Sequence, residues 1–412
     1  MYLFVFIFNF IIMWPLGAWA QNSCLSSKRA DELYNCILKY HPAEKAAQLS
    51  HEMATPGRER RTQLPNPELS YKSVSGDEAG GRVESTEVEL TIDLTDLLVK
   101  RSALSKSGRA EEKMLRVQAD EESFQVRSQI IKDLYRYRQL KEELELADEA
   151  LQTFSKIAGQ YRARKARGPD QDITLNLIEL AQGDYQLKKN HLEVEKSEAE
   201  ARYKGVFGDS FSFKTDWLPS IKKTWPAVTE AEISKNTFEL RKAEADFSLA
   251  EAEHSIANRE AWPRIAAGPA FEQTREGGRD YESTGFNISM TLPIFSQNGG
   301  AREFTEKKSI KAKYAYEYAI KKSSLEKQLL LQRYHSSVDS LKKSAGTSQL
   351  ASKHSKIDGL FRQGLTSGPV VIEAHRQILE FTESQHEHEM TAIDSLLYLN
   401  LLAGKDLSEV LR

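Results

Sequence analysis

Residues His386 to Glu389 form a His-Glu-His-Glu run, which contains the side chains best suited to binding a metal ion. On a helix, His386 and His388 point about 200° apart, so their imidazoles cannot hold one ion between them. The residue four positions after His386 is Met390, which excludes the His-Glu-x-x-His pattern of zinc peptidases. We therefore assign these histidines to helix packing or to the solvated surface, and we expect no metal site and no cofactor.

The sequence contains no recognisable catalytic constellation. A Ser-His-Asp order, a nucleophile elbow, a phosphate-binding loop and a dinucleotide fingerprint are all missing from its 412 residues. There are 57 Lys and Arg residues against 60 Asp and Glu, so the net charge of −3 leaves no positive excess to bind phosphates. We expect neither an enzyme nor a nucleic-acid-binding protein.

Three acids, Glu87, Glu89 and Asp93, alternate with apolar residues at a period of two, which predicts a strand with one polar and one apolar face. The apolar members are Val88, Leu90, Ile92 and Leu94. Carboxylates along a face that lines water would favour the passage of cations over anions. The alternative is that these acids only keep such a face hydrated.

A second alternating strand contains Phe286, Ile288, Met290 and Leu292. A partner strand precedes each of the two, at residues 68–74 and 264–273, and we expect the surface loops of two β-hairpins at residues 76–81 and 276–279. Long helical runs follow both hairpins. In the first run, positions Tyr137 to Tyr161 keep a heptad spacing, which is typical of supercoiled helices.

An internal repeat organises the chain at an offset of 196 residues, which aligns, for example, Pro67 with Pro263 and Gly168 with Gly364. The repeat predicts two copies of a strand-strand-helix-helix unit. In the first copy the helices end and begin near Gly168; in the second they cover about 301–344 and 370–402, around the turn at 364–368. The expected domains are a signal peptide (1–20), an N-terminal segment with a short helix (21–60), repeat 1 (61–208), a connecting segment (209–256), repeat 2 (257–404) and a tail (405–412).

Several aromatic residues on the predicted helices are assigned to packing: Tyr314, Tyr316, Tyr318, Tyr334 and Phe361. Each helical hairpin should be about 60 Å long or more, at 1.5 Å per residue.

The N-terminus is apolar from Leu3 to Ala20 and ends in Ala-Trp-Ala, which predicts a secretory signal peptide cleaved after Ala20. No Lys or Arg precedes the apolar run, and an uncleaved anchor is the alternative. Cys24 and Cys36 are the only cysteines, and export would allow them to form a local disulfide. The residues just before Cys24 do not favour lipid modification.

Four amphipathic strands cannot close on themselves, and a sheet in lipid must leave no open edge. If the apolar faces contact lipid, several chains must contribute hairpins to one barrel whose polar faces line water. The heptad helices would then lie side by side in a cylinder. The expected fold class is mainly α with a small β part: long antiparallel helical hairpins forming an α-barrel, plus four strands per chain in a shared transmembrane β-barrel.

This organisation resembles the TolC-like outer-membrane factor family, and within it the CzcC-type heavy-metal efflux proteins. The motifs that carry the resemblance are Leu64–Leu69, Ile288–Phe295, Asn298–Arg302, Arg362–Gly364 before Val370–Ala374, and Leu401–Gly404. The resemblance implies a homotrimer with a twelve-stranded barrel in the outer membrane and a helical barrel across the periplasm. It also implies docking to a periplasmic adaptor and to an inner-membrane pump of the RND or ABC type. The implied function is the passive exit duct of a tripartite efflux system, with heavy-metal cations as a candidate substrate.

The resemblance further implies that the tips of the helical hairpins gate the channel and dock the adaptor. By position these tips contain Arg164, Arg167, Gly168, Asp170, Asp172, Arg362, Gly364, Thr366 and Ser367. Solvated loop charges are the alternative interpretation of the charged members. Two other functions stay open: the outer-membrane duct of a type I protein secretion system, and a soluble periplasmic coiled-coil scaffold.

Overall fold

The computed structural model describes residue 24 and residues 27–78, 81–209, 211–214, 217–222, 224–295, 297–344 and 347–411. The predicted signal peptide lies outside these residues. The chain forms two compact units, each assembled from separate stretches of sequence. Unit 1 consists of Met1–Lys45, Ser123–Lys235 and Glu326–Arg412, and unit 2 of Ala46–Glu122 and Asn236–Leu325. Both units draw residues from both predicted repeats, and the repeat boundaries stay a prediction.

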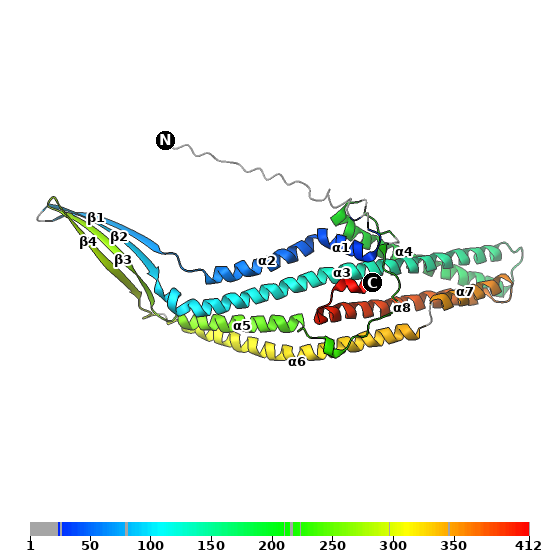
Figure 1. Cartoon of the computed structure of the whole chain (residues 1–412). Helices are drawn as coiled ribbons and strands as arrows, with labels where there is room; N and C mark the ends of the chain where they lie inside the picture. The colour runs from blue at the N-terminus through cyan, green and yellow to red at the C-terminus, as the bar shows by residue number, and fades with distance from the viewer. Residues whose placement is uncertain are drawn as a thin grey trace, which may run out of the picture. The chain divides into compact units, whose positions relative to one another are not determined.

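Unit 2 contains one antiparallel sheet in the order β1-β2-β3-β4 (Figure 1). Its strands are β1 (Glu68–Glu78), β2 (Gly81–Asp93), β3 (Arg264–Glu276) and β4 (Arg279–Thr291). The two predicted β-hairpins therefore pair with each other through β2 and β3. The prediction of a mainly helical chain with four strands is confirmed.

The register gives the sheet two chemically different faces. Leu69 lies opposite Leu90, and Ile92 opposite Ala267, so these side chains share a face. This apolar face contains Leu69, Tyr71, Val88, Leu90, Ile92, Ile265, Ala267, Phe271, Phe286, Ile288 and Met290. The polar face contains Ser70, Lys72, Glu87, Glu89, Thr91, Asp93, Ala266, Gly268, Ala270, Glu272, Asn287 and Ser289.

The hairpin loops are shorter than expected. The prediction of a loop over residues 76–81 is wrong, because β1 continues to Glu78 and still pairs Gly76 with Val83. In the second hairpin only Gly277 and Gly278 stand between the strands, with φ of 55° and 81°. Two consecutive positive φ values are what a tight two-residue hairpin turn requires, and glycine adopts them without a steric penalty.

Four helices extend from the sheet in unit 2, and ion pairs connect them in a row. They are α2 (Pro42–Thr62), α3 (Arg101–Arg162), α5 (Phe238–Arg259) and α6 (Gly299–Lys343), with a π-helical turn, Thr95–Lys100, between β2 and α3. The contacts are Arg58 with Glu112 (α2 to α3), Arg241 with Asp120 (α3 to α5) and Lys308 with Glu253 (α5 to α6). The helices thus follow the order of the strands that they adjoin, so unit 2 is a wall one element thick.

The predicted connecting segment, 209–256, contains most of α5, which belongs to the wall. One sequence expectation about these helices needs correction. Tyr314 and Tyr318 were expected to pack, but both are exposed, since α6 contacts α5 through a different stripe that includes Tyr316 stacked on Phe247. Of the other aromatics, Tyr334 is buried and Phe361 is partly buried.

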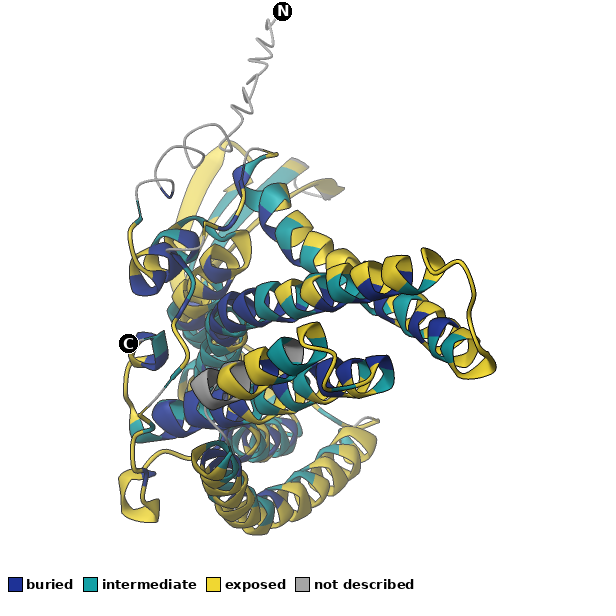
Figure 2. Ribbon diagram, turned by 90° about the vertical axis from the view of Figure 1, so that its right-hand side faces the viewer, coloured by how far each residue is buried: buried dark blue, intermediate teal, exposed yellow. Residues whose placement is uncertain are grey.

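Unit 1 is helical. It contains α1 (Ala30–Tyr40), α4 (Pro169–Phe207), α7 (Thr347–Arg362), α8 (Gly368–Ala403), the short helices Glu230–Glu232 and Leu407–Leu411, and the C-terminal parts of α3 and α6. Figure 2 shows that the long helices have buried residues along one side and exposed residues along the other. One core gathers aromatic residues, among them Tyr135, Tyr203, Phe211 and Trp217. A second core joins Phe154 of α3 and Ile178 of α4 to Leu379 of α8.

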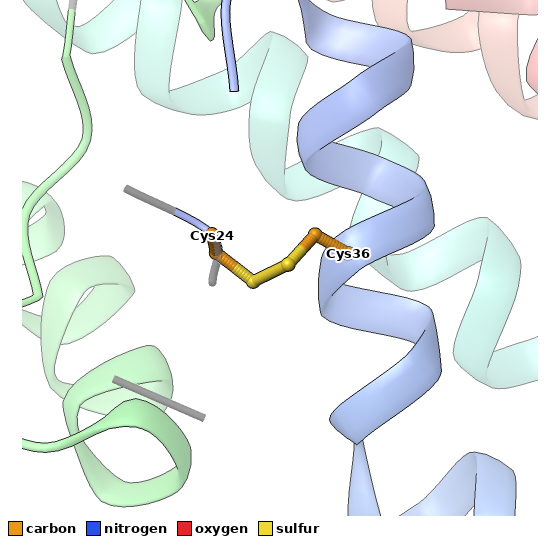
Figure 3. The surroundings of a disulfide bond; sticks show 2 residues. All are labelled: Cys24 and Cys36. Carbon is orange, nitrogen blue, oxygen red and sulfur yellow. A yellow bond between two sulfur atoms is a disulfide. The ribbon is translucent and has the colours of Figure 1, made fainter. Parts of the chain in front are cut away.

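The N-terminal part of unit 1 is fixed by a disulfide between Cys24 and Cys36, with 5.6 Å between their Cα atoms (Figure 3). Cys36 lies on α1, and the bond holds the preceding segment against that helix. None of the described helices has the length and apolar character needed to cross a membrane.

Candidate functional site

The apolar face of the sheet is exposed over its whole width. Leu69 is 70 % exposed, and Phe286 and Ile288 are each 67 % exposed. A continuous apolar surface of this kind is rare on a monomer in water and marks a surface that is covered by lipid or protein. The alternation of apolar and polar residues along the strands therefore gives the sheet an apolar face that lipid or protein is expected to cover.

The opposite face contains the three predicted acids, but they do not share one environment. Glu87 has the Lys72 ammonium 3.7 Å from its Oε2, and Glu89 accepts a hydrogen bond of 2.7 Å from the Asn287 amide. Both side chains are half-buried and stay on the open polar face.

Asp93 has a structural function in addition. Its Oδ1 accepts hydrogen bonds from the backbone N–H groups of Thr95 (2.9 Å) and Asp96 (3.1 Å), and its other oxygen pairs with Arg264. The carboxylate thus fixes the junction where β2 ends and the helical part begins. Sequence reasoning missed this contact, although Asp two residues before Thr is a frequent turn-forming arrangement.

The tip of the first helical hairpin contains charged groups that pair within the chain. Arg167 Nε donates to Asp172 Oδ1 at 2.8 Å, and the Arg164 guanidinium lies 4.8 Å from the centre of the Tyr161 ring. Gly168 precedes α4, whose first turn contains Asp170 and Asp172. Acids at that position are favoured by the partial positive charge of a helix N-terminus. Arg164 and Arg167 thus contact groups of their own chain.

The tip of the second hairpin turns at Gly364, which has a φ of 72°. Its N–H bonds to the carbonyl of Phe361, so the turn continues directly from the end of α7 at Arg362. Thr366 and Ser367 follow, and Ser367 precedes α8. A side chain at Gly368 would lie 3.2 Å from the methyl group of Thr174, so α8 begins in close contact with α4.

A charged cluster that sequence reasoning missed surrounds His386. Its Nδ1 lies 2.6 Å from Glu143 and its Nε2 3.0 Å from Glu142, both on α3. Burial lowers the pKa of His386, but hydrogen bonds and charge attraction from the two carboxylates outweigh burial and raise it above its usual value. Arg136 donates to Glu143 at 3.0 Å. His386 lies between helices, but its contacts there are ionic rather than apolar.

The cluster continues toward the core of unit 1. Arg138 pairs with Glu389, and Gln139 donates to the same carboxylate at 2.9 Å. A cavity of about 380 Å³ adjoins the cluster, lined by Arg136, Gln139, Glu143, His191, Leu192, Glu195, Glu383, His386, Glu387 and Met390. His388 is exposed. A signal was present in the sequence: His386 lies seven residues after Leu379 and seven before Ile393, both of which are buried.

Among the described residues, no group of three or more His, Cys, Asp or Glu side chains is arranged to hold a metal ion. The described residues offer three kinds of surface: an exposed apolar sheet face, an acidic polar face, and charged turns at the ends of two helical hairpins.

The fold of the chain is similar to that of solved outer membrane channels. The open-state MtrE outer membrane channel of Neisseria gonorrhoeae aligns with a TM-score of 0.70 and 16 % identity over 92 % of this chain and 90 % of its own. The chain has the outer-membrane channel fold. CusC, whose structures concern transmembrane channel formation, aligns with a TM-score of 0.66 and 15 % identity over 94 % and 95 % of the two chains.

The Campylobacter jejuni CmeC outer membrane channel has the same fold, with a TM-score of 0.63 and 12 % identity over 93 % of this chain and 91 % of its own. No protein-family model and no curated protein sequence matches the chain. The resemblance to TolC-like proteins is thus confirmed for the outer-membrane channel fold, and identities of this size leave function to be argued from the surfaces.

Proposed function

We propose that three copies of this chain form the outer-membrane exit duct of a tripartite efflux system, and that the chain belongs to the TolC-like outer-membrane factor family. In this proposal the duct conducts substrate passively and docks with a periplasmic adaptor and an inner-membrane pump. The observation that carries the proposal is the construction of unit 2. It is a wall one element thick with two open edges and two sheet faces of opposite character.

The open edges require a partner. In the described part of the chain no strand pairs with the outer side of β1 or of β4. An exposed strand edge is a template for pairing with another chain, and closure into a barrel is the arrangement that removes it. Because β1 and β4 differ, joining one edge to the other is head-to-tail, and such contacts form a ring where the rotation between copies closes. Three copies would supply twelve strands.

The helices at the two edges also expose apolar side chains. On α2, Leu49 and Met53 are 58 % and 60 % exposed, on the side away from the buried Ala47 and Ala54. On α6 the exposed stripe contains Phe304, Tyr314, Tyr318 and Leu325. Apolar stripes on both outermost helices support the same head-to-tail contact that the strands require.

Some of the charges beside these stripes have opposite signs. Glu52 and Glu59 are exposed on α2, seven residues apart, and Lys307 and Lys311 are exposed on α6. Opposite charges flanking an apolar helix seam set the choice and orientation of the partner. A copy-to-copy contact of α6 with α2 would therefore combine apolar burial with charge attraction.

Unit 1 has an unpartnered stripe of its own. Ile173, Leu180, Leu187 and Val194 recur on α4 at intervals of seven residues, and all four are exposed. A strict heptad stripe is the pattern of a helix that packs along another helix. We assign it to the neighbouring copy, so that the helical hairpins of three chains form one cylinder.

Two finer points belong to the proposal. The polar sheet face, with Glu87, Glu89 and Asp93, would line the duct and favour cations, which makes metal cations a candidate substrate. The hairpin tips, with Arg164, Arg167, Asp170 and Asp172 on one side and Arg362, Gly364, Thr366 and Ser367 on the other, would gate the duct and meet the adaptor.

Membrane fractionation tests the proposal. The full-length, tagged chain should be found in the outer-membrane fraction, and unheated gel electrophoresis should show a trimer that heating converts to a monomer. A monomer or dimer in the soluble periplasmic fraction would overturn the proposal and favour a coiled-coil scaffold. Co-purification of a cross-linked adaptor, lost on reversing the charges of the tip, tests the partner separately.

A further inference from the structure

Two histidines meet inside the second helical hairpin of unit 1. His354 on α7 and His375 on α8 have their Nε2 atoms 3.3 Å apart, and the side chains are only 8 % and 4 % exposed. Figure 1 shows α7 and α8 as neighbouring helices near the end of the chain. Because the two residues belong to different helices, any ligand held by both would connect α7 to α8.

Neighbouring groups fix how the imidazoles point. Glu149 of α3 lies with its Oε1 3.7 Å from Nδ1 of His354, and the ring of Phe154 meets that of His375 edge to face at 5.4 Å. A carboxylate near the far nitrogen of a histidine favours the tautomer with its proton on that nitrogen, which leaves the other nitrogen as the donor to a metal. The two Nε2 atoms lie within contact distance of each other.

The separation matches that of two ligands on one ion. Imidazole nitrogens bind Zn²⁺ at about 2.0–2.1 Å in tetrahedral geometry, which places two of them about 3.3 Å apart. The ring centres are 4.4 Å apart, closer than the roughly 5 Å of two imidazoles that share an ion, so both rings must tilt outward slightly. We propose that His354 and His375 form a two-histidine site for a borderline transition-metal cation such as Zn²⁺ or Co²⁺.

The chemistry of the pair selects this class of ion. Neutral imidazole suits Zn²⁺, Co²⁺, Ni²⁺ and Cu²⁺, whereas Mg²⁺ and Ca²⁺ require oxygen ligands. Two protein ligands are fewer than structural zinc sites use, so we expect weaker and reversible binding. The site does not depend on the chain acting as a duct.

The location of the pair gives binding a structural consequence. His354 lies eight residues before the end of α7 at Arg362, and His375 seven residues after the start of α8 at Gly368. At 1.5 Å per residue these distances are about 12 Å and about 10 Å. A bound ion would therefore clamp α7 to α8 two turns below the hairpin tip and restrict the movement of that tip.

The test is metal titration of the purified full-length chain in detergent, with the affinity tag removed and metal stripped by a chelator. Co²⁺ is added while its d–d absorption is followed, and Zn²⁺ is then used to displace it. We expect one saturable site per chain in the unmodified protein. The double variant His354→Gln, His375→Gln should bind at least about tenfold more weakly. The matched control, His335→Gln with His388→Gln, removes two exposed histidines and should bind like the unmodified protein.

Equal binding by the double variant and the unmodified protein would overturn the proposal, and so would loss of binding in the control variant alone. Since a substitution of buried histidines can impair folding, a second measurement uses the unmodified protein. X-ray absorption of its Zn²⁺ complex should show scattering from two imidazole rings. One ring or none would mean that the histidines form only a hydrogen bond with each other.

Discussion

Nδ1 of His386 lies 2.6 Å from Oε1 of Glu143, and this contact joins α8 to α3 through two side chains that are almost fully buried. Glu142 contacts the other imidazole nitrogen, so the ring lies between two carboxylates of neighbouring positions on one helix. Breaking a buried charge pair by removing one partner costs about 3–5 kcal/mol, because the other charge stays behind. The contact therefore makes the packing of α8 on α3 sensitive to protonation.

The first prediction concerns pH. The pKa of His386 is raised in the folded chain, so its contribution to stability is complete below the ordinary histidine pKa of about 6.5 and declines as pH rises through the folded value. His386→Gln should lower the free energy of unfolding by about 3 kcal/mol at pH 5.5 and by about 1 kcal/mol at pH 8.5. Denaturant unfolding at both pH values measures this.

His388→Gln is the control, since this neighbouring histidine is exposed and should leave the unfolding free energy nearly unchanged. The pKa of Glu142 is lowered: burial raises it, but the hydrogen bond from His386 together with the positive charges of Arg138 and His386 outweighs burial. The stability that the Glu142 carboxylate contributes is therefore lost as pH falls through its pKa in the folded chain. A stability loss in His386→Gln that did not vary with pH would contradict the ionic account.

The second prediction concerns the outer edge of α6. Replacing Tyr318 by Glu places a charge in the exposed stripe that we assign to the neighbouring copy, and burying an unpaired charge is strongly unfavourable. The proportion of heat-sensitive trimer on unheated gels should fall at least about tenfold, which corresponds to about 1.4 kcal/mol. Tyr318→Phe preserves the apolar surface and should assemble normally. Normal assembly of the Glu variant would show that this stripe does not lie in the interface between copies.

The third prediction separates the two faces of the sheet. Ile288 points to the apolar face and Asn287 to the polar face. A Lys on the lipid side of a membrane strand costs about 2–4 kcal/mol near the bilayer centre. Ile288→Lys should therefore reduce the amount recovered in the outer membrane several-fold, while Asn287→Lys should insert normally. If both variants inserted equally well, the apolar face would not contact lipid.

The fourth prediction concerns ion selectivity. Glu87 and Glu89 lie on the polar face, so reversing both charges with Glu87→Lys and Glu89→Lys should shift the reversal potential of channels in planar bilayers toward anions. A matched reversal at Glu84, on the other face near the hairpin end, should leave the reversal potential unchanged. An unchanged potential in the first variant would show that these acids do not line the conduction path.

The fifth prediction concerns the disulfide. Cys24 and Cys36 close a short loop with a sequence separation of 12. A loop of this size stabilises the folded chain by up to about 3 kcal/mol, chiefly by restricting the unfolded state. The variant with both cysteines changed to Ser should unfold at a lower temperature than the unmodified chain. Adding a reductant should lower the unfolding temperature of the unmodified chain to that of the variant and should not affect the variant.

The sequence by itself determined the local pattern. The alternation around Leu90 and Ile288 defined the strands and their faces, because side chains in a strand point to opposite sides at a period of two. The heptads from Tyr137 onward defined the long helices for a similar reason. Glycines located the hairpin turns closely, although β1 continued past Gly76, since backbone pairing with β2 outweighed the turn tendency of a single glycine.

Only the tertiary structure decided which distant residues meet. The pairing of β2 with β3, the place of α5 in the wall and the ionic cluster around His386 all join segments of the chain that no local pattern connects. The register of His386 with Leu379 and Ile393 marks it as buried, but its neighbours Glu142 and Glu143 are far away in sequence. Periodicity reports which side of an element is buried, whereas the partner on that side depends on how the whole chain folds back on itself.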